Sequence, residues 1–351
     1  MRIPVPCLPV LAIAVAAAVC QPAVAQSFAP AEAAGLDRLC RETARGPLAP
    51  TAIAIAATAE AEHQGFGGHV LDRDGRMLRF GAVEADAWRD EALGRRVPWR
   101  QVIRYWETLG GLGEGPLALR RHPGLERDAG AAGGGDLIPL AQALERLRFT
   151  DLPEPQREAL AQAAFRAAVT DIPWSAAFVS HVVLTAGVPR PRFAASMAHL
   201  DYVGEAARRS RAELSGEAAT AFYRACDPRR TPMRPGDLLC LHRHQPADLP
   251  DIDARTGLFG ALTAAMARGE RPVWNLHCDI VVSRDERRRT ASLIGGNVLQ
   301  SVVRRDIATD RRGALAAARR GPACFEDRAP GTLCRPEGAP WFVLLQAVTA
   351  E

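Results

Sequence analysis

The sequence predicts a mixed α+β fold in which N-terminal helices pack on a small antiparallel sheet. Before residue 225, apolar residues recur at helical spacing in several segments. After it, alternating apolar and polar residues indicate strands. The chain has 351 residues, of which 48% are hydrophobic. A chain of this size and composition can bury a core in one large or two modest domains.

The predicted elements place most helices before most strands. Helices are predicted over 51–62, 99–109, 137–147, 155–169, 171–188 and 196–225. Strands are predicted over 234–241, 273–282, 291–296 and 298–303. An earlier pair of strands is predicted within 67–83, where Asp74-Gly75 marks a hairpin turn. The Gly- and Ala-rich stretch 128–135 is predicted to be a loop, and 283–289 a solvated hairpin tip.

The first 25 residues are typical of an export signal. Arg2 precedes an apolar run, Leu8 to Val19, that is too short to span a bilayer, and Ala23-Val24-Ala25 forms a small-x-small cleavage pattern. We therefore expect cleavage near Ala25 and a periplasmic or secreted protein. The predicted divisions are a signal peptide at 1–25, a helical segment at 26–59, a main domain at 60–310 and a C-terminal extension at 311–351.

The charge of the chain makes no case for a nucleic-acid partner. The formal net charge is +4, and all basic side chains are arginines because no lysine occurs. The Arg-rich stretch 304–321 is predicted to be a solvated helix rather than a membrane-docking surface. No cofactor is predicted. His242 and His244 share a strand face, where a solvated strand end is expected more often than a metal site.

Six cysteines remain once the signal is removed, and an even number in an exported chain indicates disulfides. Cys324 and Cys334 enclose a short loop and form the first predicted pair. Cys226 with Cys240 is the second. The alternative role for Cys278, as a displaced nucleophile beside His277, conflicts with strand geometry, because neighbouring residues point to opposite faces.

The segment 171–188 carries the strongest local signal. Asp171 and Pro173 are typical of a helix start, and Gly187 is typical of a helix end. Ser175 therefore lies in the first turn, where unpaired N–H groups and the helix dipole converge. Since a serine hydroxyl does not ionise near neutral pH, its use as a nucleophile requires a general base. The alternative is a serine that only caps the helix.

Further polar residues follow in the second half of the chain. Asp237 ends a Pro-Gly-Asp turn before a strand. His277 and Asp279 share one face of an apolar strand, so they need hydrogen-bond partners if they are buried. Asn297 follows two glycines. A purely structural role for His277 is an equal alternative.

In this order, the motifs WSAAFVS at 174–180, RPGDLL at 234–239, the strand opened by His277 and the Gly-Gly-Asn at 295–297 resemble a known class. The class is the CHAP-type papain-like fold, the cysteine, histidine-dependent amidohydrolases and peptidases. The chain resembles more closely the bacterial domain of unknown function 2272 family, with serine in place of the catalytic cysteine. The resemblance covers roughly residues 60–310, and the helix motif is its most specific part.

The resemblance implies a papain-like fold and a site built around Ser175 as nucleophile and His277 as base. Asn297 would orient the imidazole, with Asp279 as its rival, and Trp174 and Asp237 would contact substrate. The backbone N–H of Ser175 would contribute to an oxyanion hole.

Two function classes follow from these expectations. The first is an exported hydrolase that cleaves amide bonds in peptidoglycan through the serine site. The alternative is a catalytically inactive protein of the same fold that binds the cell wall or supports envelope assembly. The expected partner is peptidoglycan or another envelope polymer, with no cofactor and no metal.

Overall fold

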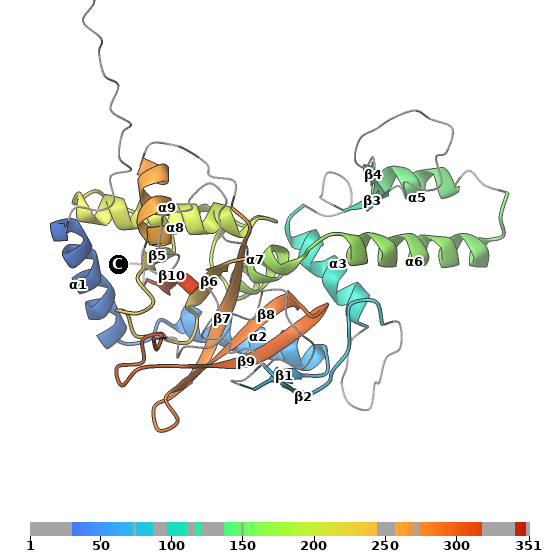
Figure 1. Cartoon of the computed structure of the whole chain (residues 1–351). Helices are drawn as coiled ribbons and strands as arrows, with labels where there is room; N and C mark the ends of the chain where they lie inside the picture. The colour runs from blue at the N-terminus through green and yellow to red at the C-terminus, as the bar shows by residue number, and fades with distance from the viewer. Residues whose placement is uncertain are drawn as a thin grey trace, which may run out of the picture.

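The computed structural model describes residues 30–72, 75–86, 97–110, 117–120, 137–148, 151–243, 257–267, 270, 274–317 and 341–348. Its architecture is mixed α+β, as predicted, with helices packed against a mostly antiparallel sheet (Figure 1). The main sheet has eight strands in the described residues, so it is larger than the small sheet predicted. Several predicted features lie outside the described residues: the signal peptide at 1–25, the loop at 128–135, Asp74, His244, Cys324 and Cys334.

The helices begin at residues that favour helix starts. Proline occupies the first turn of α2, α3 and α6, where its missing N–H is no loss. The helices of the described residues are α1 Pro30–Arg45, α2 Pro50–Gly65, α3 Pro98–Thr108, α5 Leu140–Arg148, α6 Glu154–Asp171, α7 Ser175–Thr185, α8 His199–Leu214 and α9 Gly257–Ala267, with a 3-10 turn η1 at Arg190–Arg192.

The main sheet has the strand order β2-β1-β9-β8-β7-β6-β10-β5. All neighbours are antiparallel except β1 and β9, which run parallel. The strands of this sheet are β1 His69–Leu71, β2 Met77–Arg79, β5 Tyr223–Cys226, β6 Leu238–His242, β7 Leu276–Asp285, β8 Thr290–Val298, β9 Ser301–Ala308 and β10 Trp341–Ala347. A separate two-stranded sheet pairs β3 Ala118–Arg120 with β4 Leu137–Pro139.

The observed strands confirm most of the predicted pattern and correct two parts of it. The hairpin of β1 and β2 occurs as predicted, and a hairpin tip connects β7 to β8, but β7 continues to Asp285, so the tip is shorter than the predicted 283–289. The region 196–225 is not all helical, because α8 ends at Leu214 and β5 begins at Tyr223. The predicted helix over 304–321 is wrong at its start, because residues 304–308 belong to β9. Pairing with β8 outweighed the local charge pattern there.

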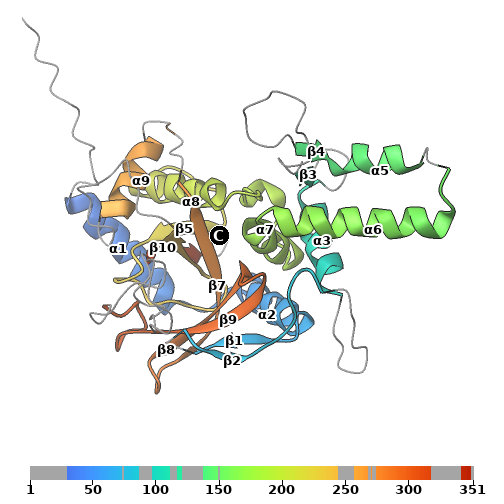
Figure 2. The same cartoon turned by 45° about the vertical axis from the view of Figure 1, so that its right-hand side comes forward.

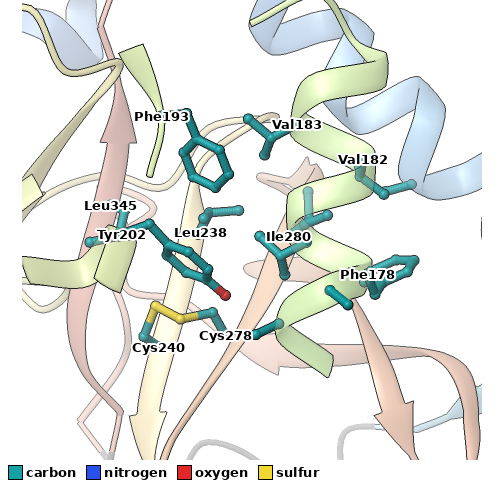
Figure 3. Packing of buried hydrophobic residues seen from close by; sticks show 14 of the residues in the cluster. Phe178, Val182, Val183, Phe193, Tyr202, Leu238, Cys240, Cys278, Ile280 and Leu345 are labelled. Atoms are coloured by element: carbon teal, nitrogen blue, oxygen red, sulfur yellow. A yellow bond between two sulfur atoms is a disulfide. The ribbon is translucent and has the colours of Figure 1, made fainter. Parts of the chain in front are cut away.

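Side chains on the two faces of the sheet form two hydrophobic clusters. Alternate residues of β6 divide between them: Leu238 and Cys240 lie in one, Leu239 and Leu241 in the other. The larger cluster includes α7 and α8, and Figure 3 shows Tyr202 and Val183 of these helices over the strands. The smaller cluster includes residues of α1. The sheet is therefore covered on both faces.

Two disulfides brace this core in the described residues. Cys40 of α1 is bonded to Cys226 of β5, and Cys240 is bonded to Cys278. The predicted pair of Cys226 with Cys240 is wrong. Cys240 and Cys278 are directly opposite each other on adjacent antiparallel strands, 4.0 Å apart at Cα, a proximity that spacing along the chain does not reveal. Because Cys278 is oxidised, it is not a free thiol nucleophile.

Part of the molecule projects to one side of the sheet. Helices α3, α5 and α6 and the β3–β4 pair lie together beyond α7 in both views (Figures 1 and 2). Helix α3 contacts α7, which links this projection to the core. Among the described residues, the helices fall short of the length and apolarity needed to cross a membrane.

Candidate functional site

A serine and a histidine meet at the first residues of two helices. Ser175 begins α7 and His199 begins α8. Ser175 Oγ lies 2.7 Å from His199 Nε2, a hydrogen-bond distance. The sequence analysis expected this contact between Ser175 and His277, so the observed partner is a correction. Sequence reasoning overlooked His199 because it considered only the histidine on a strand.

The N-terminus of α7 is held by a buried carboxylate. Trp174 precedes the helix, and its indole N–H donates to Glu84. The first backbone hydrogen bond of the helix joins Phe178 N to Trp174 O at 2.9 Å. The N–H groups of residues 175–177 thus have no partner within the helix. This turn concentrates hydrogen-bond donors and the positive end of the helix dipole beside Ser175 Oγ.

His199 is surrounded by neutral hydroxyl groups. Its Nδ1 forms a hydrogen bond with the hydroxyl of Tyr202, one turn further along α8. Burial, followed by the charges of His277 and Arg243, holds the pKa of His199 well below its ordinary value. Burial also raises the pKa of Tyr202 well above its ordinary value, so the phenol stays protonated. The pair of His199 and Tyr202 is therefore uncharged at neutral pH.

His277 lies beside His199 but has different partners. The two ring centroids are 5.3 Å apart. Arg243 Nη2 donates to His277 Nδ1 at 3.0 Å, and an arginine can only donate. The proton of neutral His277 is thus on Nε2, which donates to Asp279 Oδ1 at 2.8 Å. Burial lowers the pKa of His277 despite Asp279. Both ring nitrogens are engaged, neither of them with Ser175.

Asp279 joins His277 to Arg305. Arg305 Nε donates to Asp279 Oδ2 at 2.5 Å, and Asp279 is fully buried. Burial opposes ionisation of Asp279, but Arg305 and His277 outweigh it and lower the pKa of the carboxyl. Gly295 makes room for this carboxylate, because a Cβ there would lie 2.0 Å from Asp279 Oδ1. The side chains of His277, Asp279 and Arg305 form a hydrogen-bonded series, here called the charged ladder. It adjoins the neutral pair of His199 and Tyr202 through the contact of the two imidazole rings.

The remaining predicted site residues lie in other contacts. Asn297 Nδ2 donates to Glu84 Oε2 at 3.4 Å rather than to His277, so of the two predicted orienting residues Asp279 is the one bonded to that imidazole. Asn297 lies within β8 with a positive φ of 54°, at an irregularity where the pairing with β9 shifts register between Gly295 and Val298. Trp174 is fully buried against Glu84.

Asp237 lies in a buried turn. It accepts hydrogen bonds from the backbone N–H groups of Arg234 and Ala347, at 2.8 and 2.9 Å. Burial raises its pKa to about 7 against the opposing effect of these bonds. These contacts connect the turn before β6 to the end of β10. Its proposed contact with substrate stays a prediction.

Comparison with known protein families assigns the part of the chain that contains this site to one family. Residues 150–347 match a family described as an uncharacterized protein conserved in bacteria (DUF2272). The match covers more than half of the chain. The chain belongs to this family. No curated protein and no solved structure matches it.

The DUF2272 region contains both histidines, Ser175 and the charged ladder. Glu84, which holds Trp174 and Asn297, comes from outside the matched residues. Within the described residues, no group of three or more His, Cys, Asp or Glu side chains is arranged to hold a metal ion. The chemistry available at this site in the DUF2272 region is that of a hydroxyl, two imidazoles and a carboxylate.

One local signal for the overlooked residues exists in the sequence. His199 and Tyr202 are three residues apart, a spacing that places both on one face of a helix. Arg243 and Arg305 carry no comparable signal, because each reaches His277 or Asp279 from another strand or strand end.

Proposed function

We propose that the protein is a hydrolase of amide or ester bonds in which Ser175 is the nucleophile and His199 the general base. The 2.7 Å distance between Ser175 Oγ and His199 Nε2 carries the proposal. A serine attacks a carbonyl only when a base removes its proton, and this pair satisfies that requirement. The resemblance of the WSAAFVS motif to papain-like amidohydrolases supports the same reaction class.

The proposed reaction has two steps, acylation of Ser175 and hydrolysis of the acyl-enzyme. His199 Nε2 takes the hydroxyl proton while Ser175 Oγ bonds to the carbonyl carbon, and the proton then passes to the leaving amine or alcohol as its bond to carbon breaks. Water repeats these steps on the acyl-enzyme, which releases the acid and restores Ser175. The N–H groups in the first turn of α7 would stabilise the oxyanion.

Turnover by this pair is expected to be slow. Serine triads hold the histidine with a carboxylate that stabilises the imidazolium. His199 Nδ1 instead meets the neutral Tyr202 hydroxyl. The charge of Arg243, and that of His277 when it is protonated, also opposes a positive charge on His199. For His199 Nε2 to act as the base, the proton of the neutral ring must be on Nδ1, where it donates a hydrogen bond to the Tyr202 oxygen.

We infer that the substrates are amides of peptidoglycan stem peptides. Two disulfides are consistent with an exported protein, and cell-wall peptides are the amides that an exported bacterial hydrolase of this resemblance would meet. Acyl esters on envelope polymers are the second choice, because the same attack on a carbonyl would cleave them.

A second candidate, envelope binding without turnover, is favoured by the burial of the site. Ser175, His199 and His277 expose 4%, 5% and 4% of their surfaces. A carbonyl group would reach Ser175 Oγ only after neighbouring groups move. In a protein without that movement, the surrounding surface would bind wall peptides while the hydroxyl stays unreactive.

A fluorophosphonate probe and p-nitrophenyl acetate test the nucleophile directly. We expect the probe to label Ser175 of the wild type, as read by peptide mass spectrometry, and we expect Ser175→Ala and His199→Gln to lose labelling and ester hydrolysis. Ser180→Ala is the matched control, because Ser180 is a buried serine of α7 that bonds to the backbone of Ser196. Equal hydrolysis by the wild type and Ser175→Ala would overturn the assignment.

Peptidoglycan separates the two candidates. Release of new amino groups by the wild type but not by Ser175→Ala supports the hydrolase. Retention of both proteins on insoluble peptidoglycan without any release supports the binding protein. In Ser175→Cys, thiol-dependent activity would show that His199 and the oxyanion donors function, since a thiol needs less help from its base than a hydroxyl.

A further inference from the structure

A cavity lined by arginines lies at the opposite end of α8 from His199. Its volume is about 780 Å³, within the range of about 300–1,000 Å³ that small-molecule sites occupy. Ten residues of helix separate His199 from Arg209 of the cavity, which corresponds to about 15 Å. The residues that line it are Thr43, Gly46, Pro47, Pro191, Arg192, Arg209, Glu213, Ala219, Thr220, Arg224, Arg234 and Val348.

The charge of this lining is strongly positive. Four arginines and one glutamate among the described lining residues leave an excess of three positive charges. Arg209, Arg224 and Arg234 are 9%, 6% and 8% exposed, so these guanidinium groups are not a solvated surface. Burying several like charges together is unfavourable unless a group of opposite charge accompanies them.

Glu213 neutralises only part of that charge. Its Oε1 accepts from Arg209 Nε at 2.7 Å and from Arg224 Nη2 at 3.0 Å. Burial opposes ionisation of Glu213, but Arg224 and Arg209 outweigh it and lower the pKa of the carboxyl. Glu213 is therefore an anion shared by Arg209 and Arg224. Arg234 interacts electrostatically with the buried carboxyl group of Asp237, so Arg192 is the arginine of this lining without a carboxylate partner in the described residues.

Arg192 and Arg234 bond only to neutral groups within the described residues. Arg192 Nε donates to Thr220 O at 3.0 Å, while its guanidinium carbon lies 5.8 Å from the ring centroid of Phe222. Its two Nη groups make no hydrogen bond there, so both are available to a ligand. Arg234 donates from its Nη atoms to Gly46 O and Ala347 O, and its buried Nε has no partner in the same part of the chain.

We propose that this cavity is a binding site for a small organic anion that carries two or more negative charges. The planar guanidinium of Arg192 matches the two oxygens of a carboxylate or phosphate group. The charges of Arg234 and of the Arg209–Glu213–Arg224 cluster hold the second anionic group. Since the site is about 15 Å along α8 from His199, it binds its ligand independently of the reaction proposed at Ser175.

Titration calorimetry of the full mature chain with pyrophosphate and with citrate, in chloride buffer of matched ionic strength, tests this site. We expect at least one anion to bind the wild type with a sub-millimolar Kd and Arg192→Gln to weaken that binding at least tenfold. Arg192→Lys keeps the charge but loses the planar fork, so we expect an intermediate effect. Tighter binding of pyrophosphate indicates a phosphate-bearing ligand, and tighter binding of citrate a polycarboxylate.

Two controls separate the cavity from general charge and from the serine site. Arg208→Gln removes the same charge from the exposed face of α8 outside the cavity, so binding should stay within twofold of the wild type. Ser175→Ala should bind the anion as the wild type does, whether or not Ser175 proves to be a nucleophile. Failure of both anions to bind the wild type, or an equal loss of binding in Arg208→Gln and Arg192→Gln, would overturn the proposal.

Discussion

The two histidines of the candidate site lie side by side but in opposite electrostatic surroundings. Their ring centroids are 5.3 Å apart, and both are buried. His199 contacts two hydroxyl groups, those of Ser175 and Tyr202. His277 lies between the cation of Arg243 and the anion of Asp279. One region is thus neutral and the other charged, although burial lowers the pKa of both imidazoles.

The two histidines differ in their hydrogen-bond partners, and this difference is why we propose His199 rather than His277 as the base. The donor Arg243 and the acceptor Asp279 engage both nitrogens of His277 and hold it in one tautomer. The hydroxyl partners of His199 can donate or accept, so its Nε2 can accept a hydrogen bond from Ser175 Oγ, as the proposed reaction requires. We therefore expect the charged ladder to contribute to stability, while the reaction proposed above assigns proton transfer to His199.

Removal of the ladder carboxylate should produce the largest effect on stability. Asp279→Ala would leave the guanidinium of Arg305, which is 7% exposed, without its anion, and His277 Nε2–H without an acceptor. Loss of one partner of a buried ion pair costs about 3–5 kcal/mol in the free energy of unfolding. Urea denaturation of the wild type and the variant measures this difference.

Glu286→Ala is the control for that experiment. Glu286 pairs with Arg284 near a hairpin tip, and its side chain is 79% exposed. Because solvent screens such a pair, we expect a change of less than about 1 kcal/mol. Comparable losses in the two variants would show that the buried ladder is no more important for stability than a surface ion pair.

Removal of one hydroxyl tests the neutral region. Tyr202→Phe deletes the partner of His199 Nδ1 and should lower the free energy of unfolding by about 1–2 kcal/mol, the effect of a lost buried hydrogen bond. Tyr223→Phe is a matched control, because its buried hydroxyl donates to Gly236 O at 3.1 Å. We expect a similar loss of stability from both variants.

The two tyrosine variants should differ in the state of the imidazole. Nitrogen chemical shifts of the histidine ring, measured by NMR, report which nitrogen carries the proton. Only Tyr202→Phe is expected to change the shifts of His199, since Tyr223 contacts a backbone carbonyl group instead. Unchanged His199 shifts in Tyr202→Phe would contradict the role assigned to that hydroxyl.

The smallest expected effect is a dependence of stability on pH. The folded state lowers the pKa of His199 from 6.5, mainly by burial, so the unfolded chain binds the proton more strongly. The contribution of His199 is complete above pH 6.5 and is lost as the pH falls from 6.5 toward the folded-state pKa. At one pH unit below the unfolded value, this loss is about 1 kcal/mol.

A comparison of wild type with His199→Gln isolates that contribution. Asp237 acts in the opposite direction, because its pKa is raised to about 7 and its protonated form stabilises the fold as the pH falls. The absolute pH profile therefore combines several groups, whereas the difference between the two proteins reports His199. We expect a shallower loss of stability in the variant between pH 6.5 and 5.5, measured by urea denaturation at each pH. Parallel profiles would contradict a neutral, buried His199.

Local patterns predicted the parts of this protein that depend on neighbouring residues. The helix that begins at Ser175 follows from Pro173 and the apolar repeat after it, whereas Asp171, predicted to start this helix, is the last residue of α6. Strand alternation placed His277 and Asp279 on one face, and their observed hydrogen bond agrees with that interpretation. The sequence analysis noted the two glycines before Asn297 but not their close contacts, which Gly295 makes with Asp279 and Gly296 with Phe178.

Local sequence patterns did not predict the contacts between elements that are distant in the chain. His199 is 24 residues from Ser175, Arg305 is 26 residues from Asp279, and Glu84 is 90 residues from Trp174. The pairing of Cys240 with Cys278 follows from strand register, which spacing along the chain did not reveal.

The sequence by itself determined that Ser175 lies in the first turn of a helix, which residues alternate along β7 and that the fold is mixed α+β. Only the tertiary structure decided that His199 rather than His277 bonds to Ser175, because α7 and α8 both contact β7 and their first residues meet there. Helical and strand periodicities arise from residues close in the chain, while hydrogen-bond partners across elements depend on how those elements pack.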